Sequence, residues 1–248
     1  MDLTVAAIDR LAALGIRPDE RLVELDDGRV FGVDQDGKVS EIRERAITAQ
    51  EALEINTLSG FVNYVKANLD RTDDKLLVHI KSENNVQLKG LLEVDGSREV
   101  LAIARAIVPR FPFNEFLGME EFNIALQSKF VANDHRAILL QVVGNVSEDN
   151  VRNTGDDGVS QAVTINQGVA SKAAVKVPNP VDLAPYRTFL EVTQPESQFI
   201  FRMKDGPRGA IFEADGGAWR NQAIVNIREY LKEQLSEEIE SGRITILA

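Results

Sequence analysis

The sequence predicts an α+β fold, in which a mostly antiparallel sheet carries several amphipathic helices packed on it. Two observations lead to this prediction. In the second half of the chain, short β-type runs follow one another after brief turns, and this spacing favours antiparallel strands over βαβ units. Elsewhere, apolar residues recur at helical spacing, as Phe122, Leu126 and Phe130 do.

The N-terminal residues 1–47 are predicted to form a small unit of their own. Residues 3–15 place apolar side chains at helical spacing, and Gly15 ends the pattern. The main α+β domain is predicted over residues 48–248. Within the small unit, three β-type runs separated by Asp-Gly turn signals follow the helix, at residues 21–25, 29–33 and 38–42.

The first half of the main domain mixes helices and strands. A helix is predicted over 48–69, because Thr48 and Glu51 make a capping box before an apolar stripe. Residues 109–116 contain two prolines and are predicted to be irregular, and a helix over 119–130 follows them. Strands are predicted at 75–80, 85–94 and 98–108, of which the last suits a helix equally well.

The second half is predicted to be mainly strands. The apolar segment 137–146 suits a helix or a strand, and residues 147–160 are typical of an exposed loop. A helix over 219–235 follows the strands, and Gly242 precedes a β-type tail at 243–248. The strands themselves are predicted at 161–170, 173–183, 186–192, 197–203 and 210–214.

The composition, with 44% hydrophobic and 27% charged residues, is typical of a globular protein. The chain of 248 residues contains no Cys, which excludes disulfides, thiolate zinc sites and cysteine nucleophiles. No apolar run reaches the roughly 18 residues that a membrane span needs. The first residues lack the basic start of a secretory signal. We therefore expect a cytoplasmic protein that does not associate with membranes.

The chain is acidic, with 39 acidic and 28 basic residues and a formal net charge of -11. A phosphate backbone requires clustered Lys and Arg, so this balance argues against duplex nucleic acid as a partner. The acidic residues are scattered along the chain, which is typical of a solvated surface.

Gly216 and Gly217 stand between a predicted strand and a predicted helix, just before Trp219, the only tryptophan. Free N–H groups at a helix N-terminus attract anions, but the motifs of P-loops and dinucleotide sites are absent. Asp215 is placed to accept hydrogen bonds from these N–H groups itself. We therefore interpret the glycine pair as a structural joint. An anion site and a partner-facing Trp219 are the alternatives.

Few other residues suggest chemistry. Asp156 and Asp157 stand in an acidic turn that suits Mg²⁺ or simple exposure. Tyr186, Arg187 and Arg202 stand among aromatic residues, a pattern that suits stacking of single-stranded bases and half-buried strands alike.

The two histidines, His79 and His135, lie in different predicted elements and have no second histidine at zinc-ligand spacing. No Ser, His and Asp set stands out either. We therefore assign no catalytic residue, metal or cofactor. The candidate partner- or ligand-binding residues are Tyr186, Arg187, Arg202, Trp219, Asp156 and Asp157.

Several short motifs in the second half of the chain suggest a family. They are Asp156-Asp157-Gly158 with Gln161, Pro178 to Pro180, Pro185 to Phe189 with Pro195, and Glu213 to Trp219. Through these motifs the chain from Asn145 onward resembles the YfdQ-like family, whose members are proteins of unknown function encoded by bacteriophages and prophages. The resemblance covers roughly residues 50–236 and implies a phage or prophage origin and a place in the host cytoplasm. It supplies no catalytic residue.

Three functions follow from these observations, in order of preference. The first is a non-enzymatic, homo-oligomeric protein that acts by binding a host or phage component, with the tail at 243–248 completing a neighbour's sheet. The second is an accessory in phage replication, recombination or defence evasion that binds a nucleotide or single strand through Arg187 and Arg202. The third is a metal-dependent hydrolase that uses Asp156, Asp157 and His135.

Overall fold

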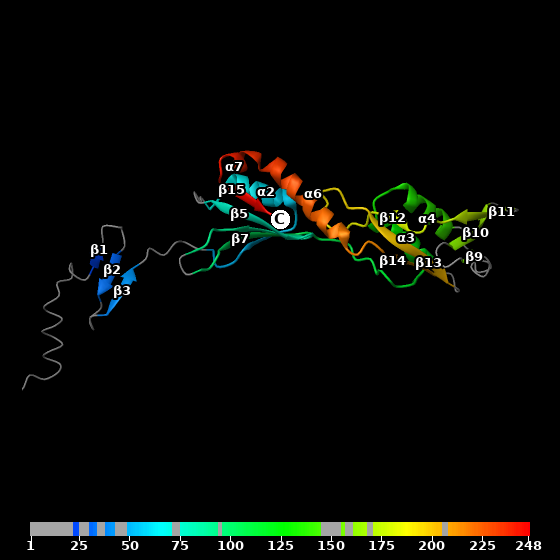
Figure 1. Cartoon of the computed structure of the whole chain (residues 1–248), viewed down its shortest axis with the longest axis horizontal. Coiled ribbons are helices and arrows are strands. Elements are labelled where there is room, and N and C mark those ends of the chain that lie inside the picture. The colour runs from blue at the N-terminus through cyan, green and yellow to red at the C-terminus, as the bar shows by residue number, and fades with distance from the viewer. Residues whose placement is uncertain are drawn as a thin grey trace, which may run out of the picture. The chain divides into compact units, whose positions relative to one another are not determined.

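The computed structural model describes residues 22–24, 30–33, 38–42, 49–70, 75–93, 96–144, 155–156, 161–167, 171–204 and 208–248. The chain divides into two compact units, residues 1–48 and 49–248. The predicted α+β class is confirmed, because helices accompany sheets in which most neighbouring strands are antiparallel (Figure 1).

The first unit contains a three-stranded antiparallel sheet in the order β1-β2-β3. Its strands are β1 (Leu22–Glu24), β2 (Val30–Val33) and β3 (Val39–Ile42). The three β-type runs of the sequence are therefore confirmed. The helix predicted over residues 3–15 lies outside the described residues.

The second unit contains a five-stranded mixed sheet in the order β15-β5-β6-β7-β4. The two outer strands run parallel to their neighbours, and the inner pairs are antiparallel. The segment at 98–108, which suited a helix or a strand, is therefore a strand. The members of the sheet are β4 (Leu53–Ile55), β5 (Leu76–Ser82), β6 (Asn85–Lys89), β7 (Val100–Arg105) and β15 (Ile244–Leu247).

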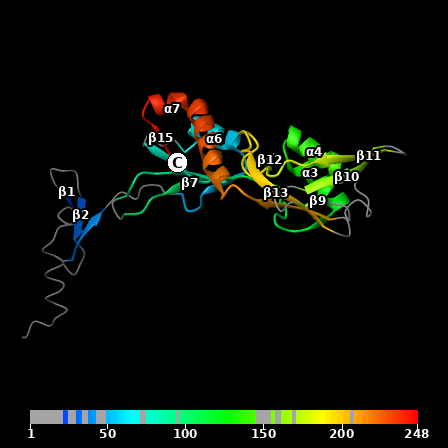
Figure 2. The same ribbon diagram turned by 45° about the vertical axis from the view of Figure 1, so that its right-hand side comes forward.

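Helices α2 (Leu58–Ala67), α6 (Ala218–Gln234) and α7 (Ser236–Glu240) lie on one side of this sheet (Figures 1 and 2). The apolar stripes of α2 and α6 face the same set of inward-pointing strand residues, because both helices repeat apolar residues every three or four positions. The buried core formed in this way includes Leu58, Phe61, Val62, Val65, Val78, Ile80, Val86, Leu88, Ala102, Ala104, Ile227, Leu231 and Ile244.

One prediction for this region was wrong. The helix begins at Leu58 rather than near residue 48, because the side chain of Thr57 caps it and accepts a hydrogen bond from Gly60 N at 3.1 Å. The preceding residues form β4 instead, at the edge of the sheet. The C-terminal tail is a strand as predicted; one side of it pairs with β5 of its own chain, and its Ile244 is 2% exposed.

A four-stranded sheet in the order β12-β13-β14-β8 forms a second layer with two helices, and its register is antiparallel throughout. The segment at 137–146, which suited either type, is largely helical. The elements are β8 (Leu117–Gly118), α3 (Met119–Lys129), α4 (Asp134–Gly144), β12 (Val181–Leu183), β13 (Ser197–Lys204) and β14 (Arg208–Glu213).

Phenylalanines form much of the core of this second layer. The irregular segment 109–116 is confirmed, and Phe113 stacks on Phe199 of β13 with ring centroids 5.5 Å apart. Phe111 meets Phe130 edge-on at 5.0 Å. These rings anchor a stretch that the two prolines keep out of regular structure.

A further antiparallel sheet has the order β11-β10-β9, with strands β9 (Gly155–Asp156), β10 (Gln161–Gln167) and β11 (Ser171–Lys176). The single strand predicted over 173–183 was wrong. It is divided between β11 and β12, which belong to different sheets, because Pro178 and Pro180 interrupt the run.

Candidate binding surfaces

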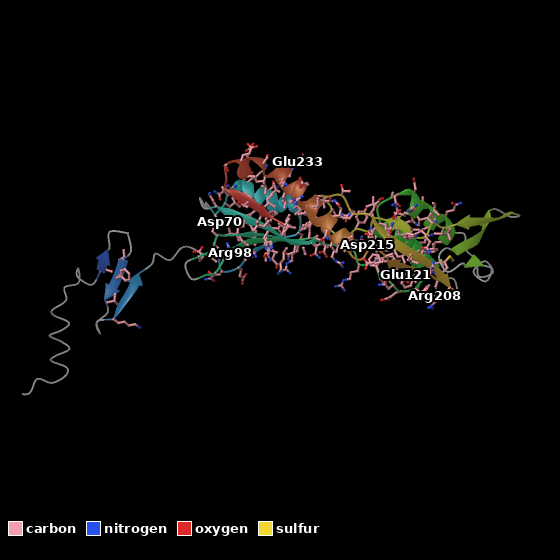
Figure 3. The ribbon with its side chains drawn as sticks, in the orientation of Figure 1. Asp70, Arg98, Glu121, Arg208, Asp215 and Glu233 are labelled. Carbon is pink, nitrogen blue, oxygen red and sulfur yellow. The ribbon has the colours of Figure 1, made fainter. Side chains whose placement is uncertain are left out.

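The joint between β14 and α6 is built as the sequence predicted. Asp215 lies at the point where the chain turns into the helix (Figure 3). Its carboxylate accepts hydrogen bonds from Gly217 N at 3.0 Å and from Trp219 N at 3.3 Å. Gly217 has φ of +84°, a left-handed conformation that glycine adopts without strain. The free N–H groups of this helix start are thus already occupied by the chain itself.

Arg187 is buried beside this joint, with 8% of its surface exposed. Its guanidinium lies 3.9 Å from the centroid of the Trp219 ring, donates to Glu213 Oε1 at 3.0 Å and also donates to Ser197 Oγ. Burial lowers the pKa of Arg187 to about 10, although the nearby carboxylates of Glu213 and Asp215 oppose this shift. Arg187 is therefore a buried charged residue whose contacts hold neighbouring parts of the fold together.

Trp219 lies in the first turn of α6 and is 6% exposed. A second guanidinium, that of Arg220, lies over its ring at 4.7 Å from the centroid. Stacking of guanidinium groups on indole is favourable when the partners are shielded from water. The ring is thus covered by side chains of its own chain and offers little surface to a partner.

The backbone around Arg187 is held by one buried glutamine. Gln194 Oε1 accepts from the N–H groups of Arg187 at 2.9 Å and Thr188 at 3.2 Å. Its Nε2 donates to the carbonyls of Phe189 at 2.9 Å and Val192 at 3.2 Å. The strand predicted over 186–192 was therefore wrong: this segment is a compact loop whose backbone groups bond to a side chain instead of to a neighbouring strand.

A polar recess of about 590 Å³ adjoins Asp215 and Trp219. Asp182, Glu196 and Asp215 contribute carboxylates to it. Burial raises the pKa of Asp215, but hydrogen bonds from Gly217, Ser197 and Trp219 and the charge of Arg187 outweigh burial, so the pKa is lowered overall. Nowhere in the described ranges do three or more His, Asp or Glu side chains gather as metal ligands would.

Tyr186 and Arg202 are the other residues considered for stacking bases. Tyr186 is half-buried, and its N–H donates to the carbonyl of Lys129 at 2.9 Å. Arg202 is half-buried on β13 and donates to the carbonyl of Phe201 at 3.1 Å. Because side chains alternate along a strand, Arg202 lies on the face of β13 opposite to Phe199 and Phe201. The structure therefore brings Arg187 and Trp219 together but leaves Arg202 on another surface.

The acidic turn considered for Mg²⁺ is only partly covered by the structure. Asp156 ends β9 and pairs with Gln161, and Asp157 lies outside the described residues. His135 belongs to α4, and its Nδ1 accepts a hydrogen bond from the N–H of Asp182 at 2.8 Å. Because a backbone N–H always donates, this Nδ1 carries no proton and is not free to bind a metal.

One face of the five-stranded sheet carries no helix in the described part of the chain. The register places Leu247, His79, Gln87, Ile103 and Glu54 across it in one row. We call this surface the open face. The remaining side chains on it, by the alternation of the strands, are Thr245, Leu77, Lys81, Asn85, Lys89 and Arg105.

The strands at the sheet edges differ in charge. Natural edge strands commonly carry charged residues, which discourage pairing with another chain. β8 has only two residues, and β15, with the sequence Ile-Thr-Ile-Leu, has four and no charge. The other edge strands of the four described sheets carry Glu24, Glu41, Glu54, Asp156, Lys172 with Lys176, and Asp182.

Sequence reasoning found some of these features and missed others. Asp215 was identified as the acceptor at the helix start, and the tail was identified as a strand with open hydrogen-bonding groups. Gln194 and the open face were missed. The available signal for the open face was that His79, Lys81, Asn85, Gln87 and Lys89 alternate with apolar residues along Leu76–Ser82 and Asn85–Lys89.

Comparisons with known protein families, with curated proteins and with solved structures found no match. The similarity to the YfdQ-like family therefore stays a prediction. Within the described ranges, no helix is long and apolar enough to cross a bilayer.

Proposed function

We propose that the chain is a non-enzymatic protein that associates with a second copy of itself through the edge of β15 and acts by binding another macromolecule. The observation that carries this proposal is the composition of β15. It is the only strand of more than two residues at a described sheet edge that lacks a charged residue.

The hydrogen-bonding groups of β15 support the same conclusion. The carbonyl of Arg243 accepts from Leu76 N at 2.8 Å, so the inner side of the tail is paired with β5. Backbone groups alternate in direction along a strand. The N–H and C=O groups of Ile244 and Ile246 therefore point to the outer edge, where an antiparallel β15 of a second copy would pair with them about a two-fold axis.

Other features set the context of this proposal. In this proposal the pair acts in the cytoplasm of a bacterial host, as the resemblance to phage and prophage proteins implies, and the bound macromolecule is a host or phage component. The Arg187 cluster stabilises the fold in this proposal and does not contact a ligand, because its guanidinium and the Trp219 ring are already covered.

Light scattering after size exclusion tests the self-association. We expect the wild-type chain, with a mass of 27.4 kDa, to elute at twice that mass. Ile246→Pro removes an N–H from the outer edge and leaves the bonds to β5 in place, so it should give a folded monomer. Ile246→Ala is the matched control: it loses the same packing but keeps the N–H, and it should stay dimeric.

Amide hydrogen exchange gives an independent measurement on the wild-type chain. Pairing at the outer edge should protect the N–H of Ile246 as strongly as the inward-pointing N–H of Thr245. A monomeric wild-type protein, or fast exchange at Ile246 beside slow exchange at Thr245, would show that this edge is unpaired and would reject the proposal.

A further inference from the structure

The open face of the five-stranded sheet carries positive charge in an acidic chain. Lys81, Lys89 and Arg105 lie on it, and Glu54 is the only acidic residue that the register places there. The whole chain has a net charge of -11. The helices on the opposite side have nearly balanced charge, with five acidic residues, among them Glu233 near the end of α6 (Figure 3), and four basic ones.

The cations of this face are available to a partner. Lys81 is exposed, and the ion pair between Arg105 and Glu54 is 4.0 Å long with side chains 58% and 73% exposed. Ion pairs that exposed contribute little and exchange easily for a new partner. Lys89 Nζ donates a hydrogen bond to His79 Nδ1 at 3.2 Å, beside the other cations of this face.

The lowered pKa of His79 indicates that the electrostatic potential around it is positive. Burial lowers its pKa first, and the charges of Lys89 and Lys81 lower it further. The imidazole is therefore neutral at neutral pH, and the lysines above it repel a further positive charge. The same lysines would attract a negatively charged group at this position.

Apolar side chains stand among these cations. Leu77 and Ile103 are half-buried and Leu247 is 47% exposed, and all three lie on the same face. Protein–protein interfaces commonly combine an apolar centre with a charged rim. Single-stranded nucleic acid is held mainly by stacking on aromatic rings, and the described residues of the open face include no Phe, Tyr or Trp.

We infer that the open face is a docking surface for an acidic, amphipathic polypeptide segment, whose carboxylates pair with Lys81, Lys89 and Arg105 and whose apolar side chains contact Leu77, Ile103 and Leu247. This surface is distinct from the outer edge of β15, and the inference does not require self-association.

Fluorescence anisotropy with a labelled helical peptide of Glu, Leu and Ala tests the inference on the full chain. We expect binding that weakens with added salt. The double variant Lys81→Gln/Lys89→Gln should weaken it about tenfold, since two ion pairs are lost. The control Lys66→Gln/Lys232→Gln removes the same charge from α2 and α6, on the other side of the sheet, and should bind as the wild type does.

Several results would overturn the inference. They are an absence of binding, an equal affinity for the same peptide with Gln in place of Glu, an unchanged affinity in the Lys81/Lys89 variant, and an equal loss in the control. Tighter binding of a labelled oligo-dT strand would assign the face to nucleic acid instead. The Lys81/Lys89 variant should keep the native mass of the wild type, so this test and that of the β15 edge fail separately.

Discussion

The guanidinium of Arg187 lies 3.9 Å from the centre of the Trp219 indole, and both residues are more than nine-tenths buried. One comes from the loop before β13 and the other from the first turn of α6. Their contact joins the four-stranded sheet, through Ser197 and Glu213, to the helix that covers the five-stranded sheet. The stability of the second unit should therefore respond to this pair.

Arg187→Met should lower the free energy of unfolding by about 2 kcal/mol, because it removes two charge-assisted hydrogen bonds and the stack on Trp219. Urea titration followed by the fluorescence of Trp219 measures this directly. The matched control is Arg202→Met, which changes a half-buried arginine on the other face of β13. This variant should lower the free energy of unfolding by less than Arg187→Met does. An Arg187→Met variant as stable as the wild type would mean that desolvation of the cation cancels its contacts.

Gln194→Met should lower the free energy of unfolding by more than Arg187→Met does, about 3 kcal/mol, although it preserves the length of the side chain. It leaves the N–H groups of Arg187 and Thr188 buried without an acceptor. Gln198→Met on β13 is the control, because Gln198 is exposed and should change stability by less than about 0.5 kcal/mol. Equal unfolding midpoints for the two variants would show that the loop does not depend on Gln194.

Asp215→Asn should make stability less dependent on pH in the acid range. The pKa of Asp215 is lower in the folded chain than its ordinary value of 3.8. The unfolded chain therefore binds the proton first, and the stabilisation by the carboxylate is complete above about pH 4 and is lost as the pH falls through the lowered pKa. Asp215→Asn should cost about 1 kcal/mol at neutral pH.

Urea unfolding of both proteins at neutral pH and near pH 2 checks this expectation. The difference between wild type and Asp215→Asn should shrink toward zero in acid. A difference that stays constant would mean that shape, and not charge, distinguishes the two side chains at this joint.

Lys89→Gln should raise the pKa of His79 toward 6.5 without reaching it, because burial is the largest cause of the shift and the charge of Lys89 is the second. The chain has only two histidines, so an NMR titration resolves both. Lys66→Gln on α2 should leave the pKa of His79 unchanged.

The lowered pKa of His79 also makes the stability of the fold depend on pH. The folded chain holds the His79 proton less tightly than the unfolded chain, so stability should fall as the pH drops through 6.5. Lys89→Gln should reduce this fall. An unaltered His79 titration in that variant would remove the electrostatic link between the two residues.

The parts of the fold that were predictable from sequence are those with strong local patterns. The stripe of Phe122 and Leu126 on α3 and the three strands β1, β2 and β3 were predicted from local patterns. The helix over 48–69 was predicted too long because Thr48 and Glu51 match a capping box, and only the pairing of β4 with β7 makes Leu53–Ile55 a strand.

The candidate surfaces depended more on tertiary structure. Asp215 could be identified because a carboxylate just before a helix has a local partner. The alternation around Arg187 suggested a strand, but Gln194 bonds to the same backbone groups from a distance of several residues. The open face could not be predicted, because it exists only if α2 and α6 cover the same side of the sheet.

The order of the five-stranded sheet has a consequence for synthesis of the chain. β5, β6 and β7 form a consecutive antiparallel group, but α6, one of the two long helices that cover them, begins at Ala218. About 110 residues separate Arg105 from Ala218, and a ribosome takes roughly 6–20 s to add them. During that interval the inward side of these strands, with Val78, Val86 and Leu88, lacks the part of its cover that α6 supplies. A nascent chain paused in this interval should therefore bind general chaperones, and release from them should follow translation of α6.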